Sequence, residues 1–362
     1  MKIYKAAIIG LGPSGLATNK ILYGDTSDEI IAFENEDINN RDNFFGFWLT
    51  DWMKPFENII EKKWYKWTIG DKDINITHTS NDKPYCVISF KKWKEYCLET
   101  KNKLEIKNKK VVQYSPIQNY YKIITSDKNE YYAEKIYDSR STKEKKGELV
   151  QHFFGINITV ADNTFKDDKL TLMHFTKEKN LLHFMYVLPF SHNRALIEST
   201  VFSKEVLEKS WYRDKINDYL SLIDISSFKE NSTEKGIIPM FFVEENKLSS
   251  PNIFNIGIRG GACKPSTGYA FSFLIKQIQL LKNSKKNYVT IHKLLERKMD
   301  KIFINFLKNN NEQGQSFIKL ASNLNGNEFQ SFMMGESSLF TKLKIIKSMP
   351  KIPFIKELFK LK

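Results

Sequence analysis

A glycine pattern close to the N-terminus restricts the folds open to this chain more than any other feature. The apolar stretch 6–9 runs directly into Gly10-x-Gly12-x-x-Gly15, and a second apolar stretch, about twenty residues further on, ends at Glu34. In a strand-turn-helix-strand unit, Gly10 forms the tight turn, Gly12 leaves room for a pyrophosphate, and Gly15 lets the helix pack on the strand. Glu34 is then placed to accept a hydrogen bond from a ribose hydroxyl. The pattern predicts a Rossmann-type dinucleotide-binding unit.

A second glycine-rich segment indicates which dinucleotide to expect. A short apolar strand precedes residues 257–269, and a helix is expected from about 267 to 281. NAD needs one fingerprint, whereas two-lobed flavoproteins close a second strand-turn-helix unit beneath the isoalloxazine ring. The positive end of that helix stabilises the anionic reduced flavin. FAD is therefore the expected cofactor, and its expected contacts in this segment are Gly257, Gly261, Pro265, Thr267 and Gly268.

Length and composition favour two lobes and disfavour a membrane-spanning, an exported or a metal-binding protein. A chain of 362 residues exceeds the usual limit for a single core. The longest uncharged apolar stretch, 184–190, is far shorter than the roughly 18–20 residues that span a bilayer. Because the first apolar stretch enters the phosphate turn directly, we expect the N-terminus to be part of the fold and the protein to be cytoplasmic. No metal site is expected, because neither the cysteines nor the histidines have metal-ligand spacing. The residues considered are Cys86, Cys97, Cys263, His152, His174, His183 and His192.

The charge of the chain favours an anionic partner. The formal net charge is +14, but no helix-turn-helix, RNP or zinc-finger pattern is present, so nucleic acid is not expected. Residues 341–362 alternate lysines with large apolar side chains, which is typical of a basic amphipathic tail lying on anionic lipid. The alternative is a C-terminal helix that covers the core and exposes a solvated lysine face.

The expected domain layout interleaves two lobes. A β-meander with strands at 169–175, 181–188 and 194–202 indicates a substrate-domain sheet. The expected segments are two FAD-binding pieces at 1–80 and 81–140, the β-sheet substrate domain at 141–250, an FAD-binding return segment at 251–285, and a helical C-terminal region with the basic tail at 286–362.

Several segments, in the same order along the chain, resemble the FAD-containing bacterial lycopene cyclase family. Residues 257–269 resemble its glycine-rich His-Pro-x-Thr-Gly-Tyr segment, and Asp138-Ser139-Arg140 resembles its Asp-x-Arg-Gly turn. Residues 188–200 resemble its Leu-Pro-Leu-Ser…Arg-x-Leu-Ile-Glu-Asp-Thr hairpin. The resemblance implies an α/β, two-lobed, hydroxylase-like flavoprotein fold and adds Asp138 and Arg140 to the expected FAD contacts.

Three positions depart from the family pattern. Lys264 stands where many members have histidine, and Ser141 replaces the glycine after the arginine. Ser199 replaces the second acid of the hairpin, which leaves a single acid there and puts a two-carboxylate scheme in doubt.

The resemblance implies a lycopene β-cyclase that converts the ψ-ends of lycopene into β-rings, giving β-carotene through γ-carotene. Glu198 is the expected general acid, because burial beside a hydrocarbon raises the pKa of a carboxyl group. Reduced FAD is expected to supply negative charge without being consumed, with NAD(P)H as the priming reductant. Trp48, Phe184, Tyr186 and Tyr269 are expected to line the substrate site, and the enzyme is expected at the inner face of the cell membrane.

Two other readings remain open. One is a redox flavoenzyme on the same scaffold, either an isoprenoid double-bond reductase or a hydroxylase. A halogenase is disfavoured, since the chain has no Trp-x-Trp-x-x-Pro pattern. The other is a flavin-binding protein of the membrane surface without turnover.

Overall fold

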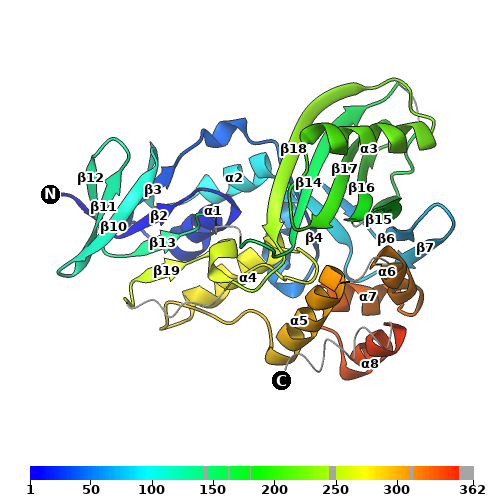
Figure 1. The fold of residues 1–362 in the computed structure, drawn as a ribbon. Helices are drawn as coiled ribbons and strands as arrows, with labels where there is room; N and C mark the ends of the chain where they lie inside the picture. Colours follow the sequence, from blue (N-terminus) through cyan, green and yellow to red (C-terminus); the bar gives the residue numbers. More distant parts are fainter. Residues whose placement is uncertain (142–144, 162–163, 180, 244–249, 310–312, 350–362) are drawn as a thin grey trace.

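The computed structural model describes residues 1–362 apart from 142–144, 162–163, 180, 244–249, 310–312 and 350–362. It shows an α/β protein with two lobes and a helical C-terminal part, as the sequence predicts (Figure 1). One lobe is built on a parallel sheet and the other on a larger mixed sheet.

Five parallel strands form the sheet of the first lobe. Their order is β19 (Ile253–Asn255), β13 (Ile136–Asp138), β2 (Ala6–Ile9), β3 (Glu29–Glu34) and β9 (Lys103–Asn108). The central strands β2 and β3 are almost wholly apolar, because both faces of the sheet are covered. One face packs against three helices: α1 (Pro13–Thr18), which the turn η1 (Asn19–Tyr23) extends, α2 (Phe90–Leu98) and α4 (Phe271–Lys282).

A four-stranded accessory sheet covers the other face. Ala7 and Ile9 of β2 pack there against Tyr121 and Ile123. The strands follow the order β1 (Ile3–Tyr4), β12 (Glu130–Ala133), β11 (Tyr120–Thr125) and β10 (Val111–Ile117).

A seven-stranded sheet forms the second lobe, and it contains the three strands of the predicted meander. Its order is β18 (Lys229–Pro239), β14 (Val150–Thr159), β17 (Arg194–Ser203), β16 (Leu181–Ser191), β15 (Lys169–Glu178), β6 (Lys66–Gly70) and β7 (Asn75–Thr79). Helix α3 (Lys209–Leu222) packs on one face. The opposite face meets the first lobe and the C-terminal helices in the largest hydrophobic core. Since β6 and β7 belong to this sheet, a boundary at residue 80 of the first FAD-binding segment is wrong.

A small sheet joins the lobes. It consists of β4 (Phe44–Trp48), β8 (Tyr85–Ser89) and β5 (Lys62–Trp64). In the sequence, the short helix η2 (Ile38–Asn40) precedes β4, and η3 (Asp51–Ile59) connects β4 to β5.

The second glycine-rich segment differs from its expected shape. A short 3-10 helix, η4 (Gly257–Gly260), follows β19, and α4 begins at Phe271 rather than near residue 267. Gly268 has a φ of +70°, a left-handed conformation that interrupts a right-handed helix. Thr267 and Gly268 therefore lie in a turn ahead of the helix.

The C-terminal part is helical, as expected. It contains α5 (Leu294–Asn309), α6 (Gln313–Ser322), α7 (Gly326–Met333) and α8 (Leu339–Ser348). None of the helices in the described ranges is long and apolar enough to cross a bilayer. Residues 350–362 of the expected tail lie outside the described residues.

Candidate active site

The carboxyl ends of neighbouring strands bring most of the predicted cofactor-binding residues to one edge of the parallel sheet. Ile9, at the end of β2, is in register with Phe33 on β3 and with Asp138 on β13. Asp138 is in turn paired with Asn255 on β19. Both glycine-rich segments follow directly from strands of this set. Open parallel sheets bind their ligands at this edge.

The three glycines of the first turn have different surroundings. Gly10 has a φ of +92°, and a methyl group on it would lie 2.5 Å from Ser139 Oγ. A methyl group on Gly15 would collide with the carbonyl oxygen of Gly10, so α1 approaches its own turn as closely as glycine permits. A methyl group on Gly12 would have no described atom within 4 Å, apart from Gly12 itself and its two neighbours in the chain. That open space is what a pyrophosphate needs.

Glu34 fastens the glycine turn to β3. Its Oε2 accepts the Leu11 N–H at 2.8 Å and lies 3.2 Å from Arg41 Nη2. Its Oε1 accepts the Asn35 N–H at 2.8 Å. Glu34 therefore holds the turn in shape, at the strand end where the fingerprint predicts the ribose contact.

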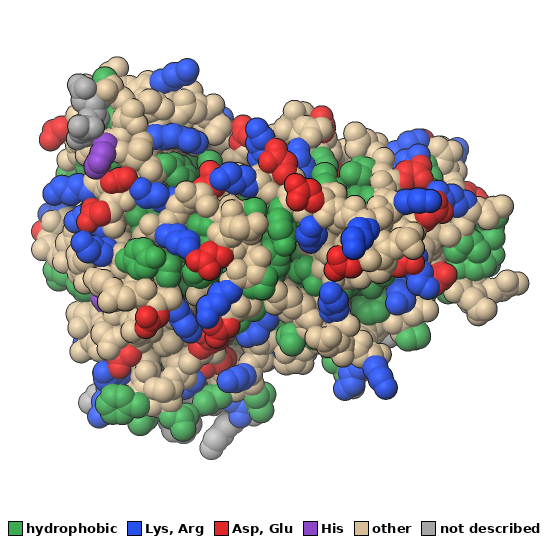
Figure 2. All heavy atoms as spheres, turned by 180° about the vertical axis from the view of Figure 1, so that it is seen from behind, with side chains coloured by type: hydrophobic (Ala, Val, Ile, Leu, Met, Phe, Trp, Pro, Cys, Tyr) green, Lys and Arg blue, Asp and Glu red, His purple; other side chains and the backbone are tan. Residues whose placement is uncertain are grey.

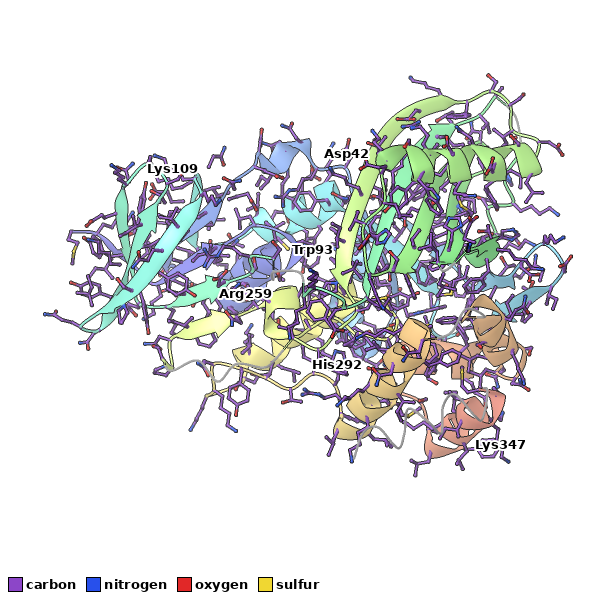
Figure 3. All side chains as sticks on the ribbon, in the orientation of Figure 1. Asp42, Trp93, Lys109, Arg259, His292 and Lys347 are labelled. Atoms are coloured by element: carbon purple, nitrogen blue, oxygen red, sulfur yellow. The ribbon has the colours of Figure 1, made fainter. Side chains whose placement is uncertain are left out.

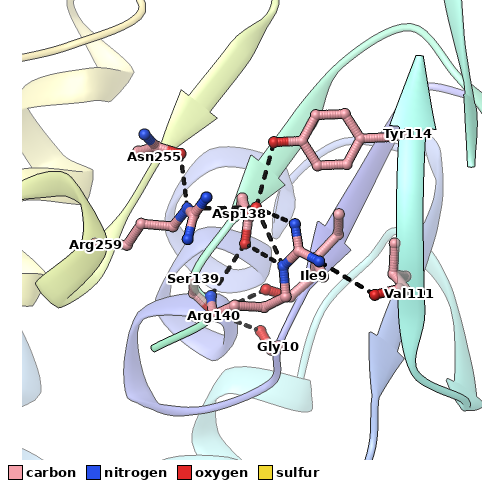
Figure 4. A network of polar contacts seen from close by, with 9 residues as sticks. All are labelled: Ile9, Gly10, Val111, Tyr114, Asp138, Ser139, Arg140, Asn255 and Arg259. Carbon is pink, nitrogen blue, oxygen red and sulfur yellow. Dashed lines mark hydrogen bonds and ion pairs between the residues drawn. The ribbon is translucent and has the colours of Figure 1, made fainter. Parts of the chain in front are cut away.

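Asp138 is the centre of a charged network (Figure 4). Its fully buried carboxylate accepts hydrogen bonds from the backbone N–H of Arg140 and from its guanidinium group, the shortest at 2.6 Å. Arg259 Nε lies 3.4 Å from the same carboxylate and donates to Asn255 Oδ1 at 3.0 Å. Tyr114 donates to it at 3.3 Å. Two guanidinium groups thus neutralise one buried charge and connect the turn after β13 with the second glycine-rich segment.

The second glycine-rich segment packs between α1 and the large sheet. A methyl group on Gly257, which has a φ of +67°, would lie 2.5 Å from Ser14 Oγ on α1. A methyl group on Gly268 would collide with Gln151 Oε1 on β14. On α4, Gln277 accepts the Gly257 N–H at 2.6 Å and donates to the Gly260 carbonyl at 2.7 Å. Because Ser14 and Gln151 leave no room for a Cβ atom, positions 257 and 268 need glycine.

Gly261 and Pro265 lie on a different side of the segment. They line a small recess shared with His292, and not the main cavity. The ring of His292, which Figure 3 labels together with Arg259, lies 3.2 Å from the carbonyl oxygens of Ala262 and Cys263. The structure therefore places these two predicted FAD contacts farther from the cavity than Thr267 and Gly268.

A cavity of about 330 Å³ lies where the two glycine-rich turns meet the small and large sheets. Pro13 and Ile258 line it from the two turns. Most of the remaining wall is apolar or aromatic, with Phe44, Phe45, Phe153, Leu172, Met173 and Phe271 among its residues. Such a wall suits a largely apolar ligand.

Three of the four predicted substrate-lining residues lie on the cavity wall. These are Phe184, Tyr186 and Tyr269. Trp48 is the exception, because it is fully buried, packs against Trp67, and does not line the cavity. Its register partner Tyr85 lines the wall instead.

Tyrosine hydroxyls gather at one end of this wall. The hydroxyl oxygens of Tyr85 and Tyr186 lie 3.0 Å apart, and a methyl group on Gly46 would collide with both. Burial raises the pKa of Tyr85, Tyr186 and Tyr269 well above the ordinary value, so all three are neutral at physiological pH.

Glu198 lies on the cavity wall in the middle of β17. As the alternation predicts, it shares a face with Leu196 and Thr200, and only 8% of the residue is exposed. It is in register with Tyr186 on β16 and with Gly155 on β14. Burial, and then the neighbouring Glu234 carboxyl, raises the pKa of Glu198 well above its usual range. Burial in this cavity therefore favours the protonated form of the Glu198 carboxyl group.

The doubt about a second carboxyl is resolved by another strand. Ser199 lies on the opposite face of β17, where its Oγ is 2.9 Å from His183 Nε2, so an acid there would not reach the cavity. Glu234 on β18 is in register with Gly155 and lies on the Glu198 face, 5% exposed. The hairpin thus keeps a single acid, and a second carboxyl group lies beside it on β18. Sequence analysis missed Glu234, because the segment 229–239 lacks the apolar alternation of a strand.

Lys264, at the family's histidine position, is fully buried away from the cavity lining. Its Nζ forms an ion pair of 2.5 Å with Asp300 on α5, and Ser266 Oγ donates to the same carboxylate oxygen at 2.6 Å. The pair ties the glycine-rich segment to the helical C-terminal part. In the part of the chain that the structure describes, no group of three or more His, Cys, Asp or Glu could hold a metal ion.

A family model described as "Lycopene cyclase protein" matches residues 6–358. The chain belongs to the lycopene cyclase family. No curated protein matches the sequence of this lycopene cyclase family member.

Solved structures similar to this family member show the same fold at low identity. A geranylgeranyl bacteriochlorophyll reductase-like protein from Thermoplasma acidophilum matches with 11% identity and a TM-score of 0.65 over 100% of both chains. HpxO from Klebsiella pneumoniae, complexed with FAD and uric acid, matches with 12% identity and a TM-score of 0.63 over 96% of this chain and 97% of that one. A mutant of the halogenase PltM in complex with FAD matches with 9% identity and a TM-score of 0.62, over 99% and 95%. The family member therefore has an FAD-binding flavoprotein fold.

Proposed function

We propose that this chain is a lycopene β-cyclase, which closes the ψ-ends of lycopene into β-rings and gives β-carotene through γ-carotene. Family membership supports the acyclic carotenoid substrate. The observation that carries the reaction type is the Glu198 carboxyl group on the wall of an aromatic cavity, where burial raises its pKa. A neutral carboxylic acid is the group that a proton-initiated cyclisation needs.

The reaction begins when Glu198 donates its proton to a terminal double bond of the end group, which becomes a tertiary cation. The adjacent double bond attacks this cation and forms the new ring bond. Loss of a proton from the ring then restores a neutral molecule. One proton enters and one leaves, so the product is an isomer of the substrate and nothing is oxidised or reduced.

The cavity wall protects the cation. The rings of Phe44, Tyr186 and Tyr269 supply π-faces, which attract a positive charge. The apolar lining keeps out water, which would otherwise trap the cation as an alcohol. The Tyr85 and Tyr186 hydroxyls are hydrogen-bonded to each other, so these two oxygen atoms are already occupied and do not attack the cation.

The carboxyl edge of the parallel sheet fits FAD, which supports it as the cofactor. Gly12 leaves space for the pyrophosphate, and Glu34 lies at the expected ribose position. At the cavity, Thr267 Oγ1 and Gln151 Oε1 are buried without hydrogen-bond partners among the described residues, and a flavin ring offers partners for both. Reduced FAD, when bound, supplies negative charge beside the cation, and NAD(P)H is needed only to prime it.

We expect Gly12→Val to abolish FAD retention without unfolding the protein. The backbone at Gly12 has an ordinary φ of −69°, and no described atom beyond the adjoining chain lies within 4 Å of the added Cβ. The new side chain therefore occupies the pyrophosphate space rather than straining the turn. Flavin absorbance and circular dichroism of the purified variant measure both effects. A folded variant with a full complement of flavin would show that the phosphate turn lies elsewhere.

Expression in a host that accumulates lycopene tests the proposed function. Pigment analysis is expected to show β-carotene, with γ-carotene as the one-ended intermediate. Unchanged lycopene despite soluble, FAD-loaded protein would reject the proposal. A saturated or hydroxylated product would favour the redox flavoenzyme instead.

The outer face of α8 supports a proposed position at the membrane, where a hydrocarbon substrate resides. Leu339, Phe340, Leu343 and Ile346 are 56–72% exposed on this helix, and their spacing puts them on one face. Figure 2 shows hydrophobic side chains at the lower edge, over the helical C-terminal part, and Figure 3 labels Lys347 on α8. An apolar helix face flanked by lysines binds anionic lipid. We propose a cytoplasmic protein at the inner face of the cell membrane, and the apolar face of α8 supports the peripheral position.

We expect the double variant Phe340→Ser, Leu343→Ser to lower liposome binding more than about tenfold, because each buried apolar side chain contributes roughly 1.5–3 kcal/mol. Sedimentation with anionic vesicles at low salt measures the change. Leu222→Ser, on α3 of the other lobe and 62% exposed in the native protein, is the control. Deleting the whole tail is a poorer test, because Ile345 and Met349 are buried. Unaltered binding by the double variant would leave α8 as a cover for the core.

A further inference from the structure

The two carboxyl groups beside the cavity meet because the strand between them carries a glycine. Gly155 on β14 is in register with Glu198 on one side and with Glu234 on the other. A methyl group on Gly155 would lie 2.7 Å from Glu198 Cγ and 3.3 Å from Glu234 Cγ. Both side chains therefore lean over Gly155 toward each other, and any larger residue at this position would push them apart.

The surroundings of the pair supply no compensating cation. The titratable groups facing it are Tyr186 on β16, Tyr85 on β8 and Tyr269 ahead of α4, all neutral at physiological pH. Lys235, next to Glu234, also lines the cavity, but by strand alternation its side chain belongs to the opposite face of β18, and it contributes to the pKa of neither carboxyl. Within the described residues, neither carboxyl forms an ion pair with lysine or arginine. Two adjacent carboxylates in such a place cannot both be ionised, so the pair keeps one proton.

The hydrogen bonds of the pair are unequal, which decides where the proton resides. Glu234 Oε2 accepts the backbone N–H of Phe44 at 2.8 Å, and a donor of this kind favours the ionised form. Glu234 Oε1 is buried without any other donor, as far as the described residues go, and so is available to a proton on Glu198. Glu198 lines the cavity and Glu234 does not. The proton therefore resides on the carboxyl that faces the substrate.

We propose that Glu234 is a positioning residue for the cyclisation: its carboxylate, fixed by the Phe44 N–H, accepts a hydrogen bond from Glu198 and keeps Glu198 protonated. This rests on the proposed function. When Glu198 gives its proton to the end group, two carboxylates are left side by side. Uptake of the proton that the cyclised cation loses relieves their repulsion and returns the pair to its starting state, so protons balance over the cycle. Burial raises the pKa of both carboxyls, but hydrogen bonds from Glu198 and from the Phe44 N–H lower that of Glu234, whereas Glu234 raises that of Glu198 further, in agreement with this arrangement.

The pH dependence of cyclisation by Glu234→Gln tests the proposal. The active form of Glu198 is protonated, so activity is lost as the pH rises through its pKa. Replacing Glu234 removes the like charge and lowers that pKa, which moves the loss of activity to lower pH by about one unit or more. Activity at acidic pH is expected to survive. The pH profile of Glu234→Asp, which keeps the charge, is expected to lie nearer to that of the wild type. Glu230→Gln, at an exposed position on the same strand, is the control.

The infrared carbonyl band of a protonated carboxyl gives a second readout, which does not depend on turnover. Purified wild-type protein at neutral pH is expected to show a band that Glu198→Gln lacks and that titrates at lower pH in Glu234→Gln. A band that persists in Glu198→Gln, or a pH profile that Glu234→Gln leaves unshifted, would overturn the proposal. Should no variant cyclise lycopene, the band still decides the state of the pair, so failure of the proposed function is distinguished from failure of this inference.

Discussion

Replacing Glu198 by glutamine is expected to lower the rate of lycopene cyclisation at least about a hundredfold, the scale of removing a general acid. Glutamine has nearly the same shape but no transferable proton. Glu198 belongs to the large sheet, and not to the parallel sheet whose carboxyl edge carries Gly12 and Glu34, so FAD binding is expected to survive. Initial rates with reduced flavin and lycopene in liposomes, together with the flavin content, measure both.

Glu230→Gln serves as the matched control for this variant, since its side chain pairs with Arg213 on the surface. It is expected to leave the rate unchanged. Near-normal cyclisation by Glu198→Gln would move the acid to another residue.

Asp300→Ala is expected to have the largest effect on stability. It leaves the Lys264 ammonium fully buried without its partner, and breaking a buried ion pair from one side costs about 3–5 kcal/mol. The free energy of unfolding from urea titration measures this loss. The variant Lys264→Met, Asp300→Leu removes both charges and is expected to recover most of the stability, because well-packed apolar residues replace buried ion pairs without large cost.

The two results together test the role assigned to Lys264. If the double variant is as unstable as Asp300→Ala, the loss comes from packing around α5 and not from an uncompensated charge. If Asp300→Ala loses less than about 1 kcal/mol, the pair does not tie the glycine-rich segment to the C-terminal helices.

The local patterns of the sequence predicted the parts of the fold that depend on neighbours along the chain. The glycine turn at Gly10 and Gly12 needs only a strand before it and a helix after it, and both are present. The hairpins of β15, β16 and β17 follow from alternating side chains and short turns. Since alternation fixes which face a side chain takes, Glu198 could be assigned to the face of Leu196 and Thr200.

The rest depended on pairings between distant segments, which no local pattern specifies. Glu234 meets Glu198 only because β14 lies between their strands with Gly155 at the shared position. Asp300 reaches Lys264 from a helix 36 residues away in the sequence. Trp48 was expected at the substrate site as an aromatic residue, yet the register of β4 with β8 gives that place to Tyr85. Such partners are set by strand order and register, which sequence spacing does not encode.

Solvent deuterium incorporation is the most direct test of a proton-initiated, non-redox cyclisation. Wild-type protein with reduced flavin and lycopene in D₂O is expected to give β-carotene carrying deuterium in each new ring, because the Glu198 proton exchanges with solvent between turnovers and the protonated carbon keeps its added hydrogen when another carbon loses one. NAD(P)H consumption, measured in the same reaction, is expected to stay far below the number of rings formed. Rings without deuterium, or one NAD(P)H oxidised for each ring, would contradict the account.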